Sequence, residues 1–231
     1  WIKRFKWPSM TDHKYKRGHV LVRSGPTIST GASRLAAVSA LRAGAGAVTL
    51  ASDSDSLLVN ASHLTSVMLK EINNADDFFN FVKEKKINTL IIGPGCGVNQ
   101  ITKELVIRAI KSEISFVLDA DGLTLFQKNP NELFDLLNKR RKRENIILTP
   151  HEGEFNRLFD FGKMSKIDKA NRAANITKST ILFKGNDTII SSPKKISLIT
   201  KDSSSFLATA GSGDVLSGIC GSFLGQGMKS H

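Results

Sequence analysis

A repeating order of apolar runs, glycine-rich turns and helix-like segments constrains the fold of this chain more than any other feature. The apolar, β-rich runs lie at residues 19–25, 47–52, 89–97, 115–123 and 180–185. The helix-like segments lie at residues 30–46, 102–112, 131–140 and 167–179, and residues 145–159 combine a strand, a turn and a helix. Apolar strands that alternate with helices are typical of a parallel sheet covered on both faces. We therefore predict an α/β fold with three layers, αβα, and right-handed crossovers.

Residues 187–200 break this order. Two β-rich runs there flank the sequence SSPKK, which is typical of a turn. The pair is interpreted as an antiparallel hairpin at the edge of the sheet. The predicted sheet is therefore mostly parallel, with one antiparallel edge hairpin.

The chain is basic, with 33 Lys and Arg residues, 21 Asp and Glu residues and a formal net charge of +12. The lysines are scattered, and no basic stripe alternates with aromatic residues as in many nucleic-acid-binding surfaces. The densest basic run, residues 138–144, is interpreted as a solvated loop. We predict no nucleic-acid partner, and the positive charge suits an anionic substrate such as a nucleotide.

The two cysteines, Cys96 and Cys220, lie in unrelated contexts without the Cys and His spacing of metal sites. Unpaired cysteines of this kind fit a reducing, cytoplasmic compartment. The sequence has no run of 18 apolar residues, so it predicts no transmembrane helix and no membrane partner.

Unusual polar and glycine motifs follow directly after several predicted strands. They are GPGCG, DADG, TPHEGE, KGND and AGSGD. Ligands of open α/β sheets bind beyond the carboxyl ends of the strands. We therefore expect the five motifs to meet at one edge of the sheet.

The motif GSGD, residues 211–214, precedes an apolar run that is typical of a helix. Its glycines permit a tight turn, and the N-terminus of the helix would attract a phosphate. Asp214 could then accept the proton of a hydroxyl that attacks the phosphoryl group. Alternatively, Asp214 only complements the helix dipole. Interior glycines in the following helix predict close packing against another element.

Residues 184–188, KGNDT, follow the last predicted parallel strand. This turn could offer Lys184 and backbone groups to a nucleotide, or it could be a plain hairpin turn. In TPHEGEF, residues 149–155, His151 could hold a substrate and Glu154 could orient a water molecule bound to Mg²⁺. Capping of the helix that follows is the alternative for both residues.

The remaining motifs carry weaker signals. GPGCG, residues 93–97, is either a wall against which a ligand lies or a simple turn. Cys96 within it has no basic neighbour in sequence and is interpreted as a small buried residue, not a nucleophile. DAD, residues 119–121, could reach a metal ion or cap a helix, and both readings stay open.

Taken in order, these stretches resemble the ADP/ATP-dependent NAD(P)H-hydrate dehydratases, a branch of the ribokinase-like superfamily, over about residues 13–227. GSGD carries the resemblance to the superfamily and TPHEGE the resemblance to the branch. Related hydroxymethylpyrimidine and pyridoxal kinases usually have Asn at the position of His151, which favours the dehydratase. A ribokinase-like small-molecule kinase is the alternative function, and a truncated, inactive nucleotide-binding module is a third.

The resemblance implies a repair enzyme, a lyase, that restores NADH or NADPH from the S-epimer of its hydrate. A phosphoryl group from ADP (or ATP), with Mg²⁺, would pass to the C6 hydroxyl, and phosphate would then leave. Asp214 would be the catalytic base. The implied substrate-binding residues are Ala32, Gly97, His151 and Asp214, and the implied nucleotide-binding residues are Lys184, Gly185, Asn186, Asp187, Thr188 and Gly213. Glu154 would assist Mg²⁺ through water.

The resemblance also implies how the chain is organised. Residues 1–16 would be a lead-in from a fused NAD(P)H-hydrate epimerase domain, and residues 17–231 would be a dehydratase domain truncated at its C-terminus. Relatives usually continue past residue 227 with helices that pack on residues 214–226, so an apolar face would be exposed here, and a homo-oligomer is expected. Arg23 and the lack of a further glycine near Gly25 depart from the family pattern.

Overall fold

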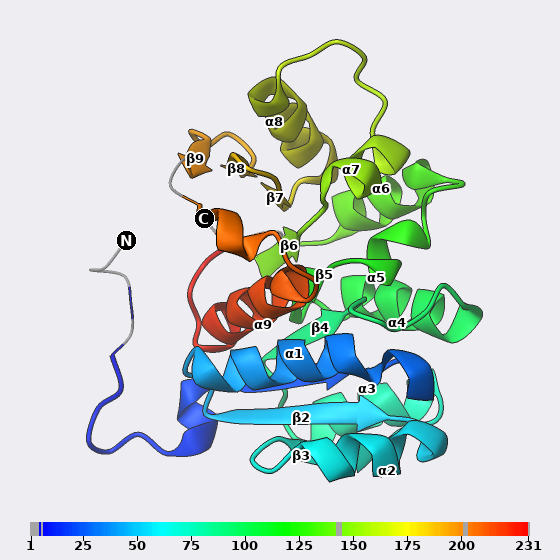
Figure 1. Ribbon diagram of the computed structural model, residues 1–231, viewed down its shortest axis with the longest axis vertical. Coiled ribbons are helices and arrows are strands. Elements are labelled where there is room, and N and C mark those ends of the chain that lie inside the picture. Colours follow the sequence, from blue (N-terminus) through cyan, green and yellow to red (C-terminus); the bar gives the residue numbers. More distant parts are fainter. Residues whose placement is uncertain (1–4, 6, 142–144, 201–202, 231) are drawn as a thin grey trace.

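In the computed structural model, which describes residues 5, 7–141, 145–200 and 203–230, one nine-stranded sheet forms the centre of the molecule (Figure 1). The strands are β1 (His19–Arg23), β2 (Ala47–Ser52), β3 (Met68–Glu71), β4 (Thr89–Ile92), β5 (Ser115–Leu118), β6 (Ile146–Leu148), β7 (Thr180–Phe183), β8 (Thr188–Ser191) and β9 (Leu198–Thr200). Their order in the sheet is β3-β2-β1-β4-β5-β6-β7-β8-β9.

The first seven strands pair in parallel, and only β8 and β9 run antiparallel to their neighbours within the described residues. The predicted hairpin at residues 187–200 therefore exists and lies at one edge of the sheet. Because β8 runs opposite to β7, the turn that joins them lies at the carboxyl edge of the parallel strands. This places KGNDT beside the turns that follow β4, β5 and β6.

Helices cover both faces of the sheet, as predicted, and the inner strands alternate their side chains between two apolar cores. Leu90 and Ile92 of β4 point into one core, whereas Ile91 points into the other. The first core is closed by α3 (Ala75–Glu84), α4 (Gln100–Lys111), α6 (Pro130–Lys139), α7 (Glu152–Leu158) and α8 (Lys166–Thr177). The second core is closed by α1 (Thr30–Arg42) and α9 (Ser212–Gly225), which lie side by side in Figure 1.

The face of α9 that packs most closely is made of small residues. A Cβ added to Gly218 would lie 1.9 Å from Oγ of Ser39 and 2.2 Å from the carbonyl oxygen of Ala36 in α1. A Cβ added to Gly221 would lie 2.5 Å from Cδ1 of Ile91 in β4. The close packing that the interior glycines predict is therefore present, against both α1 and the sheet.

The large apolar side chains of α9 are less buried than its small ones. Leu224 is buried, but Leu216, Ile219 and Phe223 are only half-buried. Phe5 covers part of this face, because its ring lies edge-on to Phe223 with the ring centres 6.0 Å apart. An apolar face is therefore present on α9, and Phe5 covers part of it.

The sequence assigns no element to residues 53–88, and the structure places α2 (Ser54–His63), β3 and α3 there. Strand β3 is an edge strand whose four residues are mostly exposed, so it lacks the apolar run by which the inner strands were recognised. The strand predicted over residues 115–123 ends earlier, at Leu118. The short helix α5 (Asp121–Thr124) follows it.

The basic run 138–144 is not simply a solvated loop, because Arg140 within it is buried. Its guanidinium donates hydrogen bonds of 2.5–3.1 Å to the carbonyl oxygens of Ala109, Ile110 and Ile114. Two of these carbonyls lie in the last turn of α4, where orphan carbonyls need donors. Arg140 therefore caps α4, and residues 142–144 of the run lie outside the described part of the chain.

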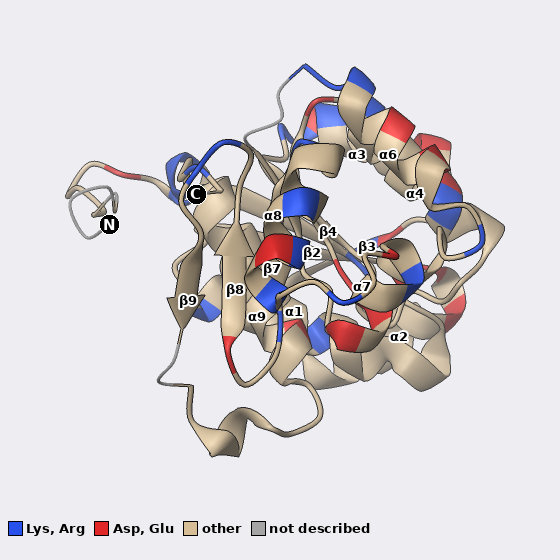
Figure 2. Ribbon diagram, turned by 90° about the horizontal axis from the view of Figure 1, so that it is seen from above, with Lys and Arg blue, Asp and Glu red and all other residues tan. Residues whose placement is uncertain are grey.

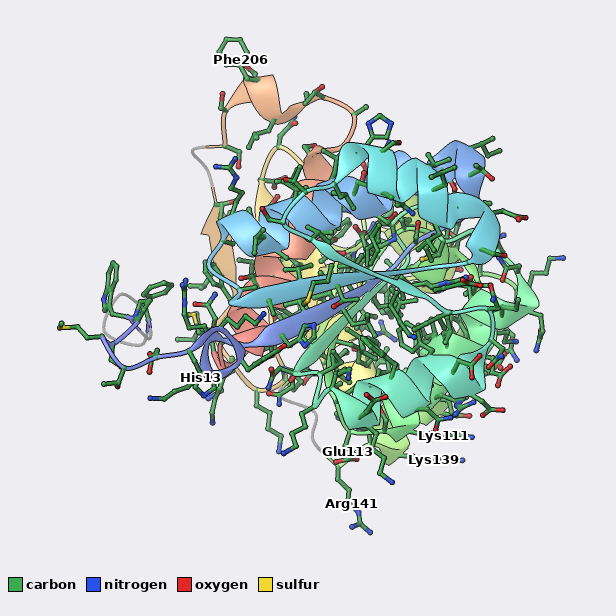
Figure 3. The ribbon with its side chains drawn as sticks, turned by 90° about the horizontal axis from the view of Figure 1, so that it is seen from below. His13, Lys111, Glu113, Lys139, Arg141 and Phe206 are labelled. Carbon is green, nitrogen blue, oxygen red and sulfur yellow. The ribbon has the colours of Figure 1, made fainter. Side chains whose placement is uncertain are left out.

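Apart from Arg23, Asp119 and Glu154, which are also buried, the other charged side chains of the described residues are at least partly exposed, with both signs mixed. Figure 2 shows blue and red segments alternating along α3, α4 and α6. Lys111, Lys139 and Arg141 point outward at one corner of the molecule, close to Glu113 (Figure 3). In the part of the chain that the structure describes, no helix is both long and apolar enough to cross a membrane.

Candidate active site

The motifs that follow the strands meet at the carboxyl edge of the sheet. Lys184, directly after β7, donates its backbone N–H to the carbonyl oxygen of Pro150, which follows β6, at 2.9 Å. Gly97, at the end of the turn after β4, donates its N–H to Oδ2 of Asp121, which follows β5, at 2.8 Å. The contacts of Lys184 with α7 and α9, described below, complete the set. The predicted convergence of the five motifs is confirmed.

The GSGD motif forms the sharp turn that starts α9. Gly211 is the N-cap residue with φ +90°, in the left-handed region that glycine adopts without strain. Because the N-cap residue has no side chain, the first N–H groups of α9 receive no N-cap side-chain hydrogen bond. The N–H of Ser212 donates to the carbonyl oxygen of Thr209 at 3.4 Å, so the N–H groups of Gly213 and Asp214 are the ones that a ligand at this helix end would use, and the helix dipole there also favours an anion.

The ammonium group of Lys184 lies between three segments of this edge. Its Nζ is 2.9 Å from Oδ1 of Asp119 and 4.0 Å from Oε2 of Glu154. It is also 3.4 Å from the position that a Cβ on Gly213 would take. Lys184 and Gly213, which were predicted separately as nucleotide-binding residues, are therefore neighbours in space. A cation beside a free helix N-terminus is a suitable environment for a phosphate group.

Asp214 is half-buried in the first turn of α9. Burial raises the pKa of its carboxyl group, and the nearby charge of Asp119 raises it further, against the opposing effect of Lys184. A carboxylate with a raised pKa is a stronger base than an exposed one. The environment of Asp214 therefore fits a proton acceptor as well as complementation of the helix dipole.

His151 and Glu154 form a capping box at the N-terminus of α7. Nδ1 of His151 accepts hydrogen bonds from the N–H groups of Gly153, at 3.0 Å, and Glu154, at 3.3 Å. Glu154 Oε2 accepts from the N–H of His151 at 2.9 Å. The capping alternative for both residues is therefore correct. The His151 side chain nevertheless remains 54% exposed, and its Nε2 lies 3.4 Å from Oε1 of Glu154.

Glu154 has a second property that capping does not require. Its carboxyl group is buried, which raises its pKa, and the charge of Asp119 adds to this effect. Glu154, Asp119 and Asp214 thus place more negative charge near Lys184 than one ammonium group balances. Within the described residues, no three His, Cys, Asp or Glu side chains are grouped to hold a metal ion directly. The donors fit a Mg²⁺ ion that keeps its waters and binds phosphate oxygens.

Ala32, in the first turn of α1, lies beside the GPGCG turn. Its Cβ is 3.2 Å from the position that a Cβ on Gly95 would take, and Ser29 Oγ donates to the carbonyl oxygen of Gly95 at 2.8 Å. Gly97 follows two residues later. Ala32 and Gly97 therefore lie around the GPGCG turn, and Gly97 is bonded to Asp121 of the DAD segment.

The KGNDT turn is held by a lysine that the sequence did not single out. Lys166 Nζ donates to Oδ1 and to the carbonyl oxygen of Asp187, both at 2.7 Å. Thr188 Oγ1 donates to the carbonyl oxygen of Gly185 at 3.1 Å, while Asn186 is exposed. Lys166 lies at the start of α8, 21 residues before Asp187, and no motif surrounds it.

Cys96 is buried in the GPGCG turn, and burial raises the pKa of its thiol to about 12. Its Sγ donates to the carbonyl oxygen of Arg23 at 3.4 Å. A thiol of this kind is not a thiolate at neutral pH and so is not a nucleophile. The interpretation of Cys96 as a buried packing residue is confirmed.

Comparison with known proteins identifies the family to which the chain is similar. Residues 20–231 match the family model Carb_kinase, described as NAD(P)H-hydrate dehydratase. The chain is 31% identical to the bifunctional NAD(P)H-hydrate repair enzyme Nnr of Coxiella burnetii over 94% of its own length and 43% of that protein. It is 32% identical to the ADP-dependent (S)-NAD(P)H-hydrate dehydratase of Neisseria meningitidis serogroup B, over 97% of the chain and 75% of that protein. The chain thus spans less than half the length of the bifunctional relatives that it matches.

Solved structures share the fold. A ribokinase-like superfamily protein of Enterococcus faecalis superposes with a TM-score of 0.81 at 20% identity, covering 95% of this chain and 75% of that one. The ADP/ATP-dependent NAD(P)H-hydrate dehydratase of Bacillus subtilis, co-crystallised with ATP and Mg²⁺, superposes with a TM-score of 0.75 at 22% identity, covering 96% and 81%. The fold is therefore ribokinase-like, as predicted.

Proposed function

The chain belongs to the NAD(P)H-hydrate dehydratase family, and on that premise we propose that it restores NADH or NADPH from the S-epimer of its hydrate at the expense of a nucleotide. Such an enzyme is a hydro-lyase of metabolite repair. The observation that carries the proposal is the position of Lys184 and Asp214 together at the N-terminus of α9. ADP is the proposed phosphoryl donor, because the Neisseria relative is named as ADP-dependent.

Asp214 is the proposed base. Its carboxylate accepts the proton of the C6 hydroxyl, and the hydroxyl oxygen forms a bond to the terminal phosphorus of ADP. The bond from that phosphorus to its bridging oxygen breaks, and AMP leaves with the electron pair. Loss of phosphate from C6 and of a proton from the adjacent ring carbon then restores the double bond. The raised pKa of Asp214 suits the first of these steps.

The phosphates of the nucleotide are proposed to lie against Gly213 and the free N–H groups of α9, with Lys184 beside them. The rest of the turn, Gly185 to Thr188, would line the nucleotide. Ala32, Gly97 and His151 would bind the hydrated dinucleotide along the same edge. The exposure of the His151 side chain, which is 54%, supports its part in this proposal.

Mg²⁺ is the proposed metal, with Glu154 as a contact through water. When bound, the ion would neutralise phosphate charge and polarise the transferred group. The residues of the chain would contribute in two ways. Lys184 would offset the charge of the phosphates, and the half-buried setting of Asp214 would limit access of water to the reacting hydroxyl.

The organisation of the chain is proposed from its relatives. Residues 17–231 would form the dehydratase domain, and residues 1–16 would be a lead-in from an NAD(P)H-hydrate epimerase domain, because several relatives are named as bifunctional repair enzymes. The half-buried apolar residues of α9 support a homo-oligomer. The unpaired Cys96 and Cys220 support a cytoplasmic location.

The test supplies the protein with ADP, Mg²⁺ and chemically hydrated NADH and follows the near-ultraviolet absorbance of NADH. Recovery of the absorbance with release of AMP and phosphate supports the proposal. The Asp214→Asn variant should lose this recovery and still bind ADP, since the turn that holds the phosphates is unchanged. Phosphorylation of a vitamin-like alcohol without recovery of NADH would instead favour a kinase, and near-normal turnover of the Asp214→Asn variant would refute the role of Asp214.

A further inference from the structure

A buried carboxylate connects the proposed nucleotide lysine to the helix that carries the proposed base. Asp119 follows β5, and its side chain is 2% exposed. Its Oδ1 accepts a hydrogen bond from Lys184 Nζ at 2.9 Å, and its Oδ2 accepts from Ser217 Oγ at 2.6 Å. Ser217 is fully buried in α9, one turn after Asp214. Asp119 therefore joins the ends of β5 and β7 to α9.

A negative charge on Asp119 is unfavourable beside the proposed phosphate site unless it stabilises another part of the site. A carboxylate beside a phosphate site repels the phosphate, and burying a charge costs free energy unless the charge is paired. Both oxygens of Asp119 are nevertheless committed, one to each partner. The arrangement is more than helix capping, because neither partner belongs to α5, the helix that follows Asp119.

Lys184 needs such an anchor. Its ammonium is a point charge on a flexible stem with four carbons, and such a group takes up many positions unless it is held. A competing carboxylate is close, because Glu154 Oε2 lies 4.0 Å from Nζ, on the side of α7. Without Asp119, the ammonium would be shared between Glu154 and Asp214, the other two carboxylates near it. The bond to Asp119 fixes its position beside Gly213.

We propose that Asp119 is a positioning residue for the reaction proposed above and that it acts through Lys184. The hydrogen bond from Ser217 fixes the position of α9 relative to Asp119. The inference rests on the proposed function, since Lys184 must serve a nucleotide for its position to matter. Asp119 itself touches neither substrate in this proposal. It sets where the ammonium group stands relative to the N-terminus of α9.

The test is a double-mutant cycle between Asp119→Asn and Lys184→Met, with the dissociation constant for ADP and Mg²⁺ measured by titration calorimetry. If Asp119 acts through Lys184, Lys184→Met should weaken ADP binding about tenfold in the wild-type background, because a charge-assisted hydrogen bond is lost. In the Asp119→Asn background, the same substitution should weaken ADP binding less than about twofold. Asp119→Asn alone should weaken binding. Simple removal of a repulsive charge predicts tighter binding instead.

Stability is read in the same variants. Lys184→Met leaves the buried carboxylate of Asp119 without its cation, so this variant should melt at a lower temperature than the double variant, which carries neither charge. If Lys184→Met does not fold, the comparison of Asp119→Asn with the double variant still decides. The ADP dissociation constants of the two should differ by less than about twofold, and both should bind more weakly than the wild type. Lys163→Met, at an exposed lysine between α7 and α8, is the matched control and should not interact with Asp119→Asn.

The outcomes separate the two proposals. Equal weakening by Lys184→Met in both backgrounds, or an Asp119→Asn variant that binds ADP as tightly as the wild type, would overturn the role of Asp119 and leave the proposed function intact. Wild-type protein that binds no ADP would overturn the proposed function, and this inference with it. Turnover is an independent measurement. Ser217→Ala removes the hydrogen bond that holds α9, and with it Asp214, against Asp119, so it should lower kcat more than it changes the ADP dissociation constant.

Discussion

The substitution Gly218→Ala tests how closely α9 must pack on α1. The added Cβ would lie 1.9 Å from Ser39 Oγ and 2.2 Å from the carbonyl oxygen of Ala36, and the second of these atoms is backbone that cannot rotate away. Overpacking of this kind costs about 3 kcal/mol at the upper end of the usual range, because one helix must shift. Replacing an interior glycine by alanine returns about 1 kcal/mol of helix propensity. The free energy of unfolding should therefore fall by about 2 kcal/mol.

For a chain of this size, that loss corresponds to a melting temperature lower by about 4–8 °C, measurable by calorimetry or circular dichroism. Gly31→Ala in α1 is the matched control, because the nearest atom to its added Cβ is the flexible Arg34 Nη2 at 4.0 Å. That variant should be as stable as the wild type or up to about 0.5 kcal/mol more stable. A Gly218→Ala protein that melts at or above the wild-type temperature would refute the argument. Adding Ser39→Ala should recover only part of the loss, since the carbonyl contact remains.

Four further outcomes are expected. Arg140→Met should lower the free energy of unfolding by about 3 kcal/mol in chemical denaturation, because buried carbonyls of α4 lose their donors, whereas Lys139→Met at the exposed neighbour should change it little. Turnover should fall on acidification at a higher pH than an exposed aspartate would give, because burial raises the pKa of Asp214; a pH–rate profile with only ordinary carboxylate values would contradict this. Burial also raises the pKa of Glu154, so its protonated form favours the folded state. Its contribution to the free energy of unfolding, measured by chemical denaturation at several pH values, should therefore be favourable at low pH and be lost as pH rises through its pKa in the folded state. Cys96 should resist alkylation in the native protein near neutral pH and react only after unfolding, as seen by mass spectrometry, because its pKa lies near 12.

Features with a local signal could be predicted from the sequence. The inner strands are buried on both faces and therefore appear as continuous apolar runs, and the hairpin at residues 187–200 is marked by its turn. Strand β3 was missed because an exposed edge strand of four residues needs no apolar run. Residues 138–144 were misjudged for a related reason. The sequence shows that Arg140 is charged, but only the fold shows that α4 ends where its guanidinium can reach three carbonyls.

In the candidate site, too, some residues could be predicted from the sequence and others only from the fold. Its motifs could be placed because each one follows a strand, and the carboxyl ends of parallel strands share one edge. Asp119 kept two open readings, and neither a metal contact nor a helix cap describes its bonds to Lys184 and Ser217. These partners are 65 and 98 residues away along the chain, and no local pattern selects Asp119 over Asp121. Lys166 has no motif at all, and only the packing of α8 beside the β7–β8 turn identifies it.

The small residues of α9 connect the stability of the fold to the geometry of the site. Interior glycines cost about 1 kcal/mol each in a helix, yet α9 has Gly218 and Gly221 on its buried face. They let α9 approach α1 and β4 closely enough for Ser217 to reach Asp119 at 2.6 Å. A helix held one methyl group farther away would lose that bond and would move Asp214 relative to Lys184. The same contacts that make Gly218→Ala destabilising therefore set the distance between the proposed base and the proposed phosphate site, so the variant should lose activity in excess of its loss of folded protein.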